Sequence, residues 1–111
     1  MKQLLLFFFG ALLLSSCADN EPIFIPLCID QEIPVFAQVA CPGSGDLTIW
    51  SFDGQDVFCF NEGGCYADPR AFIYDADCDL LCVLGGVDGN DTCLGLSWAD
   101  NAQYLELVYV Y

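Results

Sequence analysis

The chain has 111 residues, of which 56% are hydrophobic, and it carries 16 acidic residues, 2 basic residues and no histidine. This length fits one small domain, which buries about 60–65% of its unfolded surface and therefore has a modest core. Nucleic-acid binding through a basic patch is excluded because Lys and Arg form no cluster. The shortage of histidine and lysine, the commonest catalytic bases and activators, argues against an enzyme.

The N-terminal residues have the layout of a cleaved secretory signal. Lys2 precedes an apolar run from Leu4 to Leu14, and two serines separate that run from Cys17. A membrane span is not expected, because it needs about 20 apolar residues. The layout resembles the lipobox of bacterial lipoproteins, in which the cysteine is acylated and a peptidase cuts just before it. The resemblance implies a signal peptide at residues 1–16 and an envelope protein held to a membrane by acyl chains. The alternative is an ordinary secretory signal in which the cysteine is incidental.

Residues 17–27 are predicted to form a lipidated tether, because Pro22 and Pro26 oppose regular structure. The stretch Asp19-Asn20-Glu21 resembles the acidic surface-export signals of Bacteroidota lipoproteins. We therefore expect an outer-membrane location, with the domain on the periplasmic side or exposed on the surface. After cleavage, Arg70 is the only basic side chain, so anionic headgroups would repel the domain and the acyl chains must hold it.

The first folded element is predicted to be a helix over residues 29–40. One buried helical face is indicated by the spacing of Ile29, Ile33, Phe36 and Ala40. Asp30 is the expected N-cap, Pro34 is expected in or near the first turn, and Cys41-Pro42-Gly43 is expected to end the helix.

The pattern then changes to a period of two, which is typical of strands. Four β-rich runs are predicted as strands, at residues 47–52, 57–60, 71–74 and 80–84. The first two flank Asp53-Gly54, a strong hairpin signal, and the second two turn through residues 75–79. A loop is expected over 85–95. The Ser97-x-x-Asp100 spacing of a capping box predicts a short helical turn, and a last strand is expected over 104–111.

These elements predict an α+β domain over residues 28–111, with one N-terminal helix packed on a four- to five-stranded antiparallel sheet. Seven cysteines follow the lipobox cysteine: Cys28, Cys41, Cys59, Cys65, Cys78, Cys82 and Cys93. No C-x-x-C pair occurs, so disulfides in an oxidising compartment are favoured over a metal site. Two or three intramolecular disulfides are expected, and one thiol stays unpaired or bonds another chain. The sequence leaves the connectivity open.

Several motifs follow one another in a recognisable order: Trp50…Asp53-Gly54-Gln55-Asp56-Val57-Phe58, Cys65-Tyr66-Ala67-Asp68, Ile73-Tyr74-Asp75 and Cys82…Gly85-Gly86-Val87-Asp88-Gly89-Asn90…Cys93. This order is similar to that of small uncharacterised Bacteroidota lipoproteins over residues 28–111. The resemblance implies fold and location but no activity. It also implies that Cys65, Cys82 and Cys93 take part in disulfides, whereas Cys59 and Cys78 depart from the pattern and are expected to form an added bridge.

The Asp75-x-Asp77-x-Asp79 stretch resembles the opening of a calcium loop. The EF-hand interpretation fails, because Leu80 and Gly86 occupy the positions that need glycine and a bidentate acid. Aspartates of this kind commonly form turns, which is the simpler interpretation. The alternative is a different calcium site that combines this turn with the following loop, using Asp75, Asp77, Asp79, Asp88, Asn90 and Asp91.

Aromatic residues are concentrated in the predicted strands. They are Trp50, Phe52, Phe58, Phe60, Phe72, Tyr74, Trp98, Tyr104, Tyr109 and Tyr111. Core packing accounts for most of them, and any that lie on an outer sheet face would suit a glycan or a partner protein. We therefore expect a non-catalytic lipoprotein without a cofactor, acting as an accessory, binding or structural module, with a calcium-binding module as the alternative.

Overall fold

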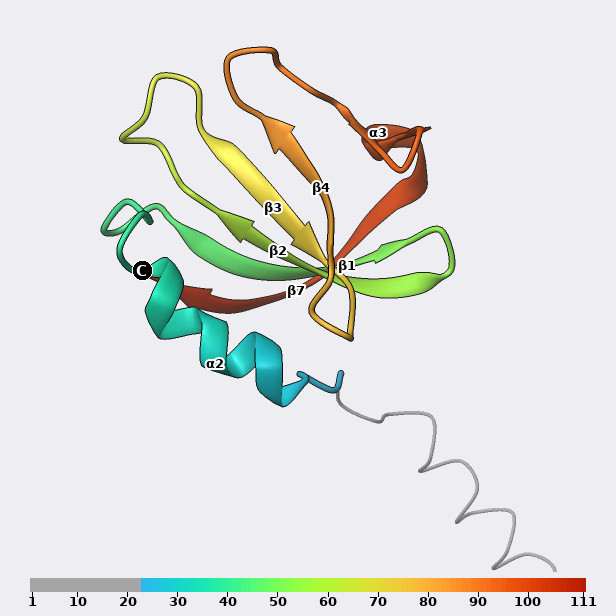
Figure 1. Ribbon diagram of the computed structural model, residues 1–111, viewed down its shortest axis with the longest axis horizontal. Coiled ribbons are helices and arrows are strands. Elements are labelled where there is room, and N and C mark those ends of the chain that lie inside the picture. The colour runs from blue at the N-terminus through green and yellow to red at the C-terminus, as the bar shows by residue number, and fades with distance from the viewer. Residues whose placement is uncertain (1–22) are drawn as a thin grey trace, which may run out of the picture.

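A five-stranded antiparallel sheet organises residues 23–111, the part of the chain described in this computed structural model (Figure 1). The strand order is β4–β3–β2–β1–β7, so β4 and β7 are the two edges. The strands are β1 (Asp46–Phe52), β2 (Gln55–Asn61), β3 (Arg70–Tyr74), β4 (Leu80–Gly85) and β7 (Ala102–Val110). The predicted α+β class is confirmed. The predicted signal peptide, residues 1–16, and Cys17 lie outside the described residues.

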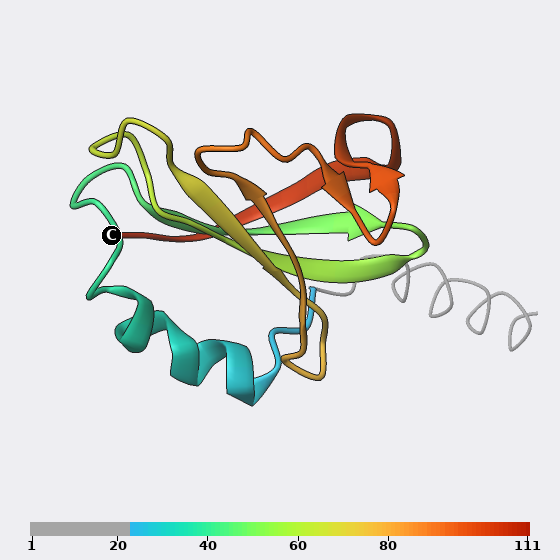
Figure 2. The ribbon, with the colours of Figure 1, turned by 45° about the horizontal axis from the view of Figure 1, so that its top comes forward.

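Smaller layers lie on the two faces of the sheet (Figure 2). Helix α2 (Leu27–Phe36) lies along one face, which we call the α2 face. The opposite face, the α3 face, carries the hairpin of β5 (Thr92–Cys93) and β6 (Leu96–Ser97) together with the short helix α3 (Trp98–Asn101). Neither of these helices has the length and hydrophobicity that a membrane span requires.

Two tight turns set the hairpins. Asp53 and Gly54 both have positive φ, 49° and 81°, as a type I′ turn requires, and Phe52 pairs directly with Gln55. The predicted hairpin is therefore confirmed. Between β5 and β6, Leu94 and Gly95 also both have positive φ. The prediction of one loop over 85–95 is wrong at β5, which lies within that range. The strand was missed because two residues are too few to show an alternating pattern.

The helix differs from its prediction at both ends. It begins at Leu27 after the N-cap Pro26, whose carbonyl accepts the N–H groups of residues 29 and 30, so Asp30 is in the first turn and is not the N-cap. Pro34 lies near the C-terminal end of the helix. Because proline has no N–H, the carbonyl four residues earlier, at Asp30, lacks its helical hydrogen bond, and Asp30 is exposed. The helix ends at Phe36, and residues 37–39 continue as turns.

The predicted tether is wrong over residues 23–27. Ile23 and Ile25 pack against the core on the α2 face, and Pro26 is buried. Apolar side chains at alternating positions therefore hold this segment to the domain, whereas the prediction considered only the extended backbone that proline favours.

The core has one layer on each face of the sheet, because successive strand residues point to opposite faces. On the α2 face the buried residues are Ile29, Phe36, Leu47, Ile49, Phe58 and Phe60. On the α3 face they are Phe52, Val57, Cys59, Ile73, Leu84 and Cys93. The helical turn predicted from the Ser97-x-x-Asp100 spacing is confirmed as α3, and Ser97 is its N-cap, since the Ser97 hydroxyl accepts the Asp100 N–H at 3.4 Å.

Three disulfides join these layers. They are Cys28–Cys78, Cys41–Cys65 and Cys82–Cys93. Cys65, Cys82 and Cys93 therefore take part, as predicted. The expected Cys59–Cys78 bridge is wrong, because Cys59 packs on the α3 face and Cys78 packs on the α2 face, with the sheet between them. Cys59 is buried and has no disulfide partner within residues 23–111.

Candidate functional site

The two acidic loops proposed to share a calcium ion lie at opposite ends of β4 (Figure 1). The six residues of β4 span five residue steps of about 3.3 Å each, which separates the loops by about 17 Å. Within the first loop, one Asp75 carboxylate oxygen accepts the N–H groups of Asp77 at 2.9 Å and Asp79 at 3.0 Å. Asp75 therefore closes the turn, as the simpler interpretation holds.

The second acidic loop, residues 86–91, is closed by Asn90. Its amide nitrogen donates to the carbonyl oxygens of Val83 at 2.8 Å and Thr92 at 2.9 Å. Across residues 23–111, no three acidic, cysteine or histidine side chains are grouped as a metal site requires. The combined site of Asp75, Asp77, Asp79, Asp88, Asn90 and Asp91 is therefore not assembled, because β4 holds its two halves apart.

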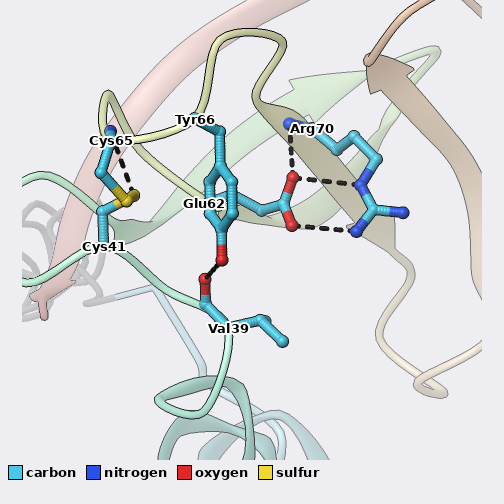
Figure 3. A network of polar contacts seen from close by, with 6 residues as sticks. All are labelled: Val39, Cys41, Glu62, Cys65, Tyr66 and Arg70. Carbon is cyan, nitrogen blue, oxygen red and sulfur yellow. Dashed lines mark hydrogen bonds and ion pairs between the residues drawn. A yellow bond between two sulfur atoms is a disulfide. The ribbon is translucent and has the colours of Figure 1, made fainter.

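Buried Glu62 and exposed Arg70 form a charge pair that the sequence interpretation missed (Figure 3). Glu62 is only 3% exposed, and its carboxylate accepts the Arg70 Nε and Nη2 donors, each at 3.0 Å, as well as the Arg70 backbone N–H at 2.8 Å. These hydrogen bonds lower the pKa of Glu62 from its ordinary value of 4.5. The sequence did contain one indication of this pair. Arg70 is the single basic residue of a very acidic domain, so a carboxylate is expected to lie close to it.

The Glu62–Arg70 pair fixes the loop between β2 and β3. Beside it, Tyr66 donates its hydroxyl to the Val39 carbonyl at 2.7 Å, and Cys65 is bonded to Cys41 (Figure 3). A cavity of about 450 Å³ opens next to Arg70. The carboxylate of Glu62 offsets the guanidinium charge, so the cavity has little attraction for an anion. We interpret this region as structural.

Edge strand β7 presents a different surface, which its register with β1 defines. Tyr104 pairs with Trp50, Leu107 with Thr48 and Val110 with Asp46. Side chains directly opposite each other on paired strands share a face. The register shifts twice, once between each two successive pairs of the three just named. At each shift β7 carries one residue more than β1. These two bulges place Tyr104, Leu107 and Val110, three residues apart, together on the α3 face.

These side chains are largely uncovered. Tyr104 is 49% exposed, Leu107 48% and Val110 50%. Trp98 of α3 stacks on Phe52 at 5.1 Å, so α3 covers the far end of β1 and leaves this part of the sheet open. We call the half-buried Trp50 with Tyr104, Leu107 and Val110 the β7 patch.

The rings of the β7 patch support one another. Trp50 meets Tyr104 edge to face, with 5.5 Å between the ring centroids. The Trp98 ring is tilted against that of Trp50 at 5.3 Å. Its indole N–H donates to the Thr48 hydroxyl at 2.9 Å, which holds the ring in place. The patch is therefore a supported apolar surface, of the kind that aromatic residues form at protein interfaces.

The remaining aromatic side chains of β7 and the C-terminus serve the fold. Tyr109 pairs with Leu47, on the α2 face, and its ring lies 4.8 Å from that of Tyr111. Tyr111 donates its hydroxyl to the Ile33 carbonyl of α2 at 2.6 Å. Burial raises the pKa of Tyr111 to about 12. Of the aromatic residues proposed for binding, Tyr104 and Trp50 are thus the pair that the structure brings together with exposed apolar neighbours.

The fold and this surface define a small disulfide-bonded α+β domain with an exposed apolar sheet edge. Comparison with protein-family models, with curated proteins and with solved structures finds no match in any of the three.

Proposed function

We propose that this protein is a non-catalytic lipoprotein of the bacterial outer membrane, acylated at Cys17, whose domain binds another envelope protein through the β7 patch. The apolar run and the lipobox-like Cys17 support the location. The observation that carries the binding role is the exposure of Tyr104, Leu107 and Val110 on one open face of the sheet. Apolar side chains gathered on one surface typically mark an interaction site.

A protein partner suits the β7 patch better than a glycan does. Sugars stack on the flat face of an exposed aromatic ring, but Tyr104 meets Trp50 edge to face and Trp50 is half-buried. Leu107 and Val110 add aliphatic surface, which packs well against apolar side chains of a protein.

Site-specific photo-cross-linking in intact cells tests this role. Leu107→p-benzoylphenylalanine places the reactive group within the β7 patch, and Leu80→p-benzoylphenylalanine on β4 is the matched control at the other edge, where Leu80 is also exposed. We expect one discrete envelope-protein adduct from position 107 that is absent from position 80. Adducts that are the same at both positions, or none at 107, would contradict the proposal.

A further inference from the structure

We infer that the partner of the β7 patch presents a polypeptide segment with an apolar centre flanked on both sides by Lys or Arg. This inference rests on the proposed function, because it specifies the chemistry of the segment that the patch binds. It comes from the acidic residues that lie at the two ends of the patch.

At one end of the patch, Asp46 lies directly opposite Val110 and therefore shares the α3 face with it. Asn61 donates its amide to an Asp46 carboxylate oxygen at 2.6 Å, which fixes the position of this charge. At the other end, Asp100 is exposed in α3, just before β7 begins. The apolar centre is thus bordered by a negative charge at each end.

The spacing of these charges sets the length of the complementary segment. Tyr104 and Val110 lie opposite Trp50 and Asp46, which are four residue steps apart on β1, so the patch is about 13 Å long. An extended partner segment therefore needs about five central residues between its basic flanks. A basic group near each end would pair with Asp46 and Asp100 while apolar side chains cover the patch.

A second copy of this chain is disfavoured as the occupant. The described residues contain one basic side chain, Arg70, and its guanidinium is held by Glu62. Two copies would thus bring acidic rims together without free cations to offset them. The two bulges also interrupt the regular edge of β7, which opposes continuous pairing with another strand.

The probe is a capped, fluorescein-labelled peptide with a Leu-Thr-Leu-Thr-Leu centre and two lysines at each end. Its counterpart carries glutamates in place of the lysines. Fluorescence anisotropy with the full-length protein in non-ionic detergent should show at least tenfold tighter binding of the lysine peptide. The preference should shrink between about 50 and 500 mM salt, because screening weakens the flanking pairs.

Three variants locate the binding. Leu107→Asn removes patch surface and should weaken lysine-peptide binding at least fivefold, and Asp100→Asn should reduce the preference over the glutamate peptide. Leu80→Asn, which changes an equally exposed leucine on β4, should leave binding unchanged. Circular dichroism spectra that match the wild type show that each variant is folded.

Four outcomes would overturn the inference: equal binding of both peptides, no loss in Leu107→Asn, a dimer in sedimentation velocity that Leu107→Asn abolishes, or binding of neutral oligosaccharides at Tyr104. A cross-linked partner from position 107 without basic residues around its contact would also overturn it, while leaving the proposed function intact. Peptide binding as expected, with no envelope adduct at 107, would instead reject the proposed function.

Discussion

Removal of the Cys28–Cys78 disulfide should cost about 4 kcal/mol of unfolding free energy. The bridge closes a loop of 50 residues, and the chain-entropy relation gives this value for a loop of that length. Cys28 is exposed and Cys78 half-buried, so alanines in their place remove little packing. The same relation gives about 3 kcal/mol for Cys82–Cys93, but Cys93 is fully buried and its loss would add a packing term.

The assay is urea unfolding of Cys28→Ala/Cys78→Ala, followed by tryptophan fluorescence. If the bridge acts by restricting the unfolded chain, the variant should also show a larger m-value, because its unfolded state exposes more surface. Leu27→Ala, at an exposed helix position next to the bridge, is the control for a change in α2 itself. A loss below about 1 kcal/mol with an unchanged m-value would refute this reasoning.

Three further predictions test the site and the anchor. Glu62→Gln should have a lower free energy of unfolding than the wild type at neutral pH, because the lowered pKa of Glu62 means that its ionised form stabilises the fold. This difference should narrow as the pH falls below 4.5 and Glu62 becomes protonated. Unfolding of both proteins, followed over an acid titration, checks this. Burial raises the pKa of Cys59 from 9.0 to about 12, so the free energy of unfolding of the wild type should fall by about 1 kcal/mol between pH 9 and 10. Urea unfolding at both pH values should show a smaller fall for Cys59→Ala. Cys17→Ala should abolish incorporation of labelled fatty acid, and unchanged labelling would exclude acylation at this residue.

Local patterns identified the elements that form from nearby residues. The Asp53-Gly54 turn and the Ser97 N-cap depend on a few adjacent residues, so their sequence signals were sufficient. The helix ends were less well defined, because Pro26 can begin a helix and Pro34 can be tolerated within one when the affected carbonyl faces solvent. Proline alone therefore marked the wrong boundaries.

Long-range pairing was beyond the sequence. Nothing local indicates that β7 pairs with β1, or that Cys78 forms a disulfide with Cys28 of α2, 50 residues earlier. A strict period of two along β7 would place Tyr104 and Leu107 on opposite faces. The bulge between them brings them to the same face, and the second bulge does the same for Leu107 and Val110. Bulges depend on the partner strand as much as on the strand's own residues. The β7 patch thus required the structure.

The C-terminal residue links the proposed binding surface to the rest of the fold. β7 has only β1 beside it in the sheet, but Tyr111 accepts the Gly43 N–H, donates its own N–H to Gly45 and reaches the Ile33 carbonyl of α2 through its hydroxyl. These bonds fix the end of the strand that carries Val110. A surface held in place before binding loses less conformational entropy when a partner docks. Under the proposed function, the contacts of Tyr111 with α2 would therefore favour binding at the β7 patch on the opposite face, without touching the partner.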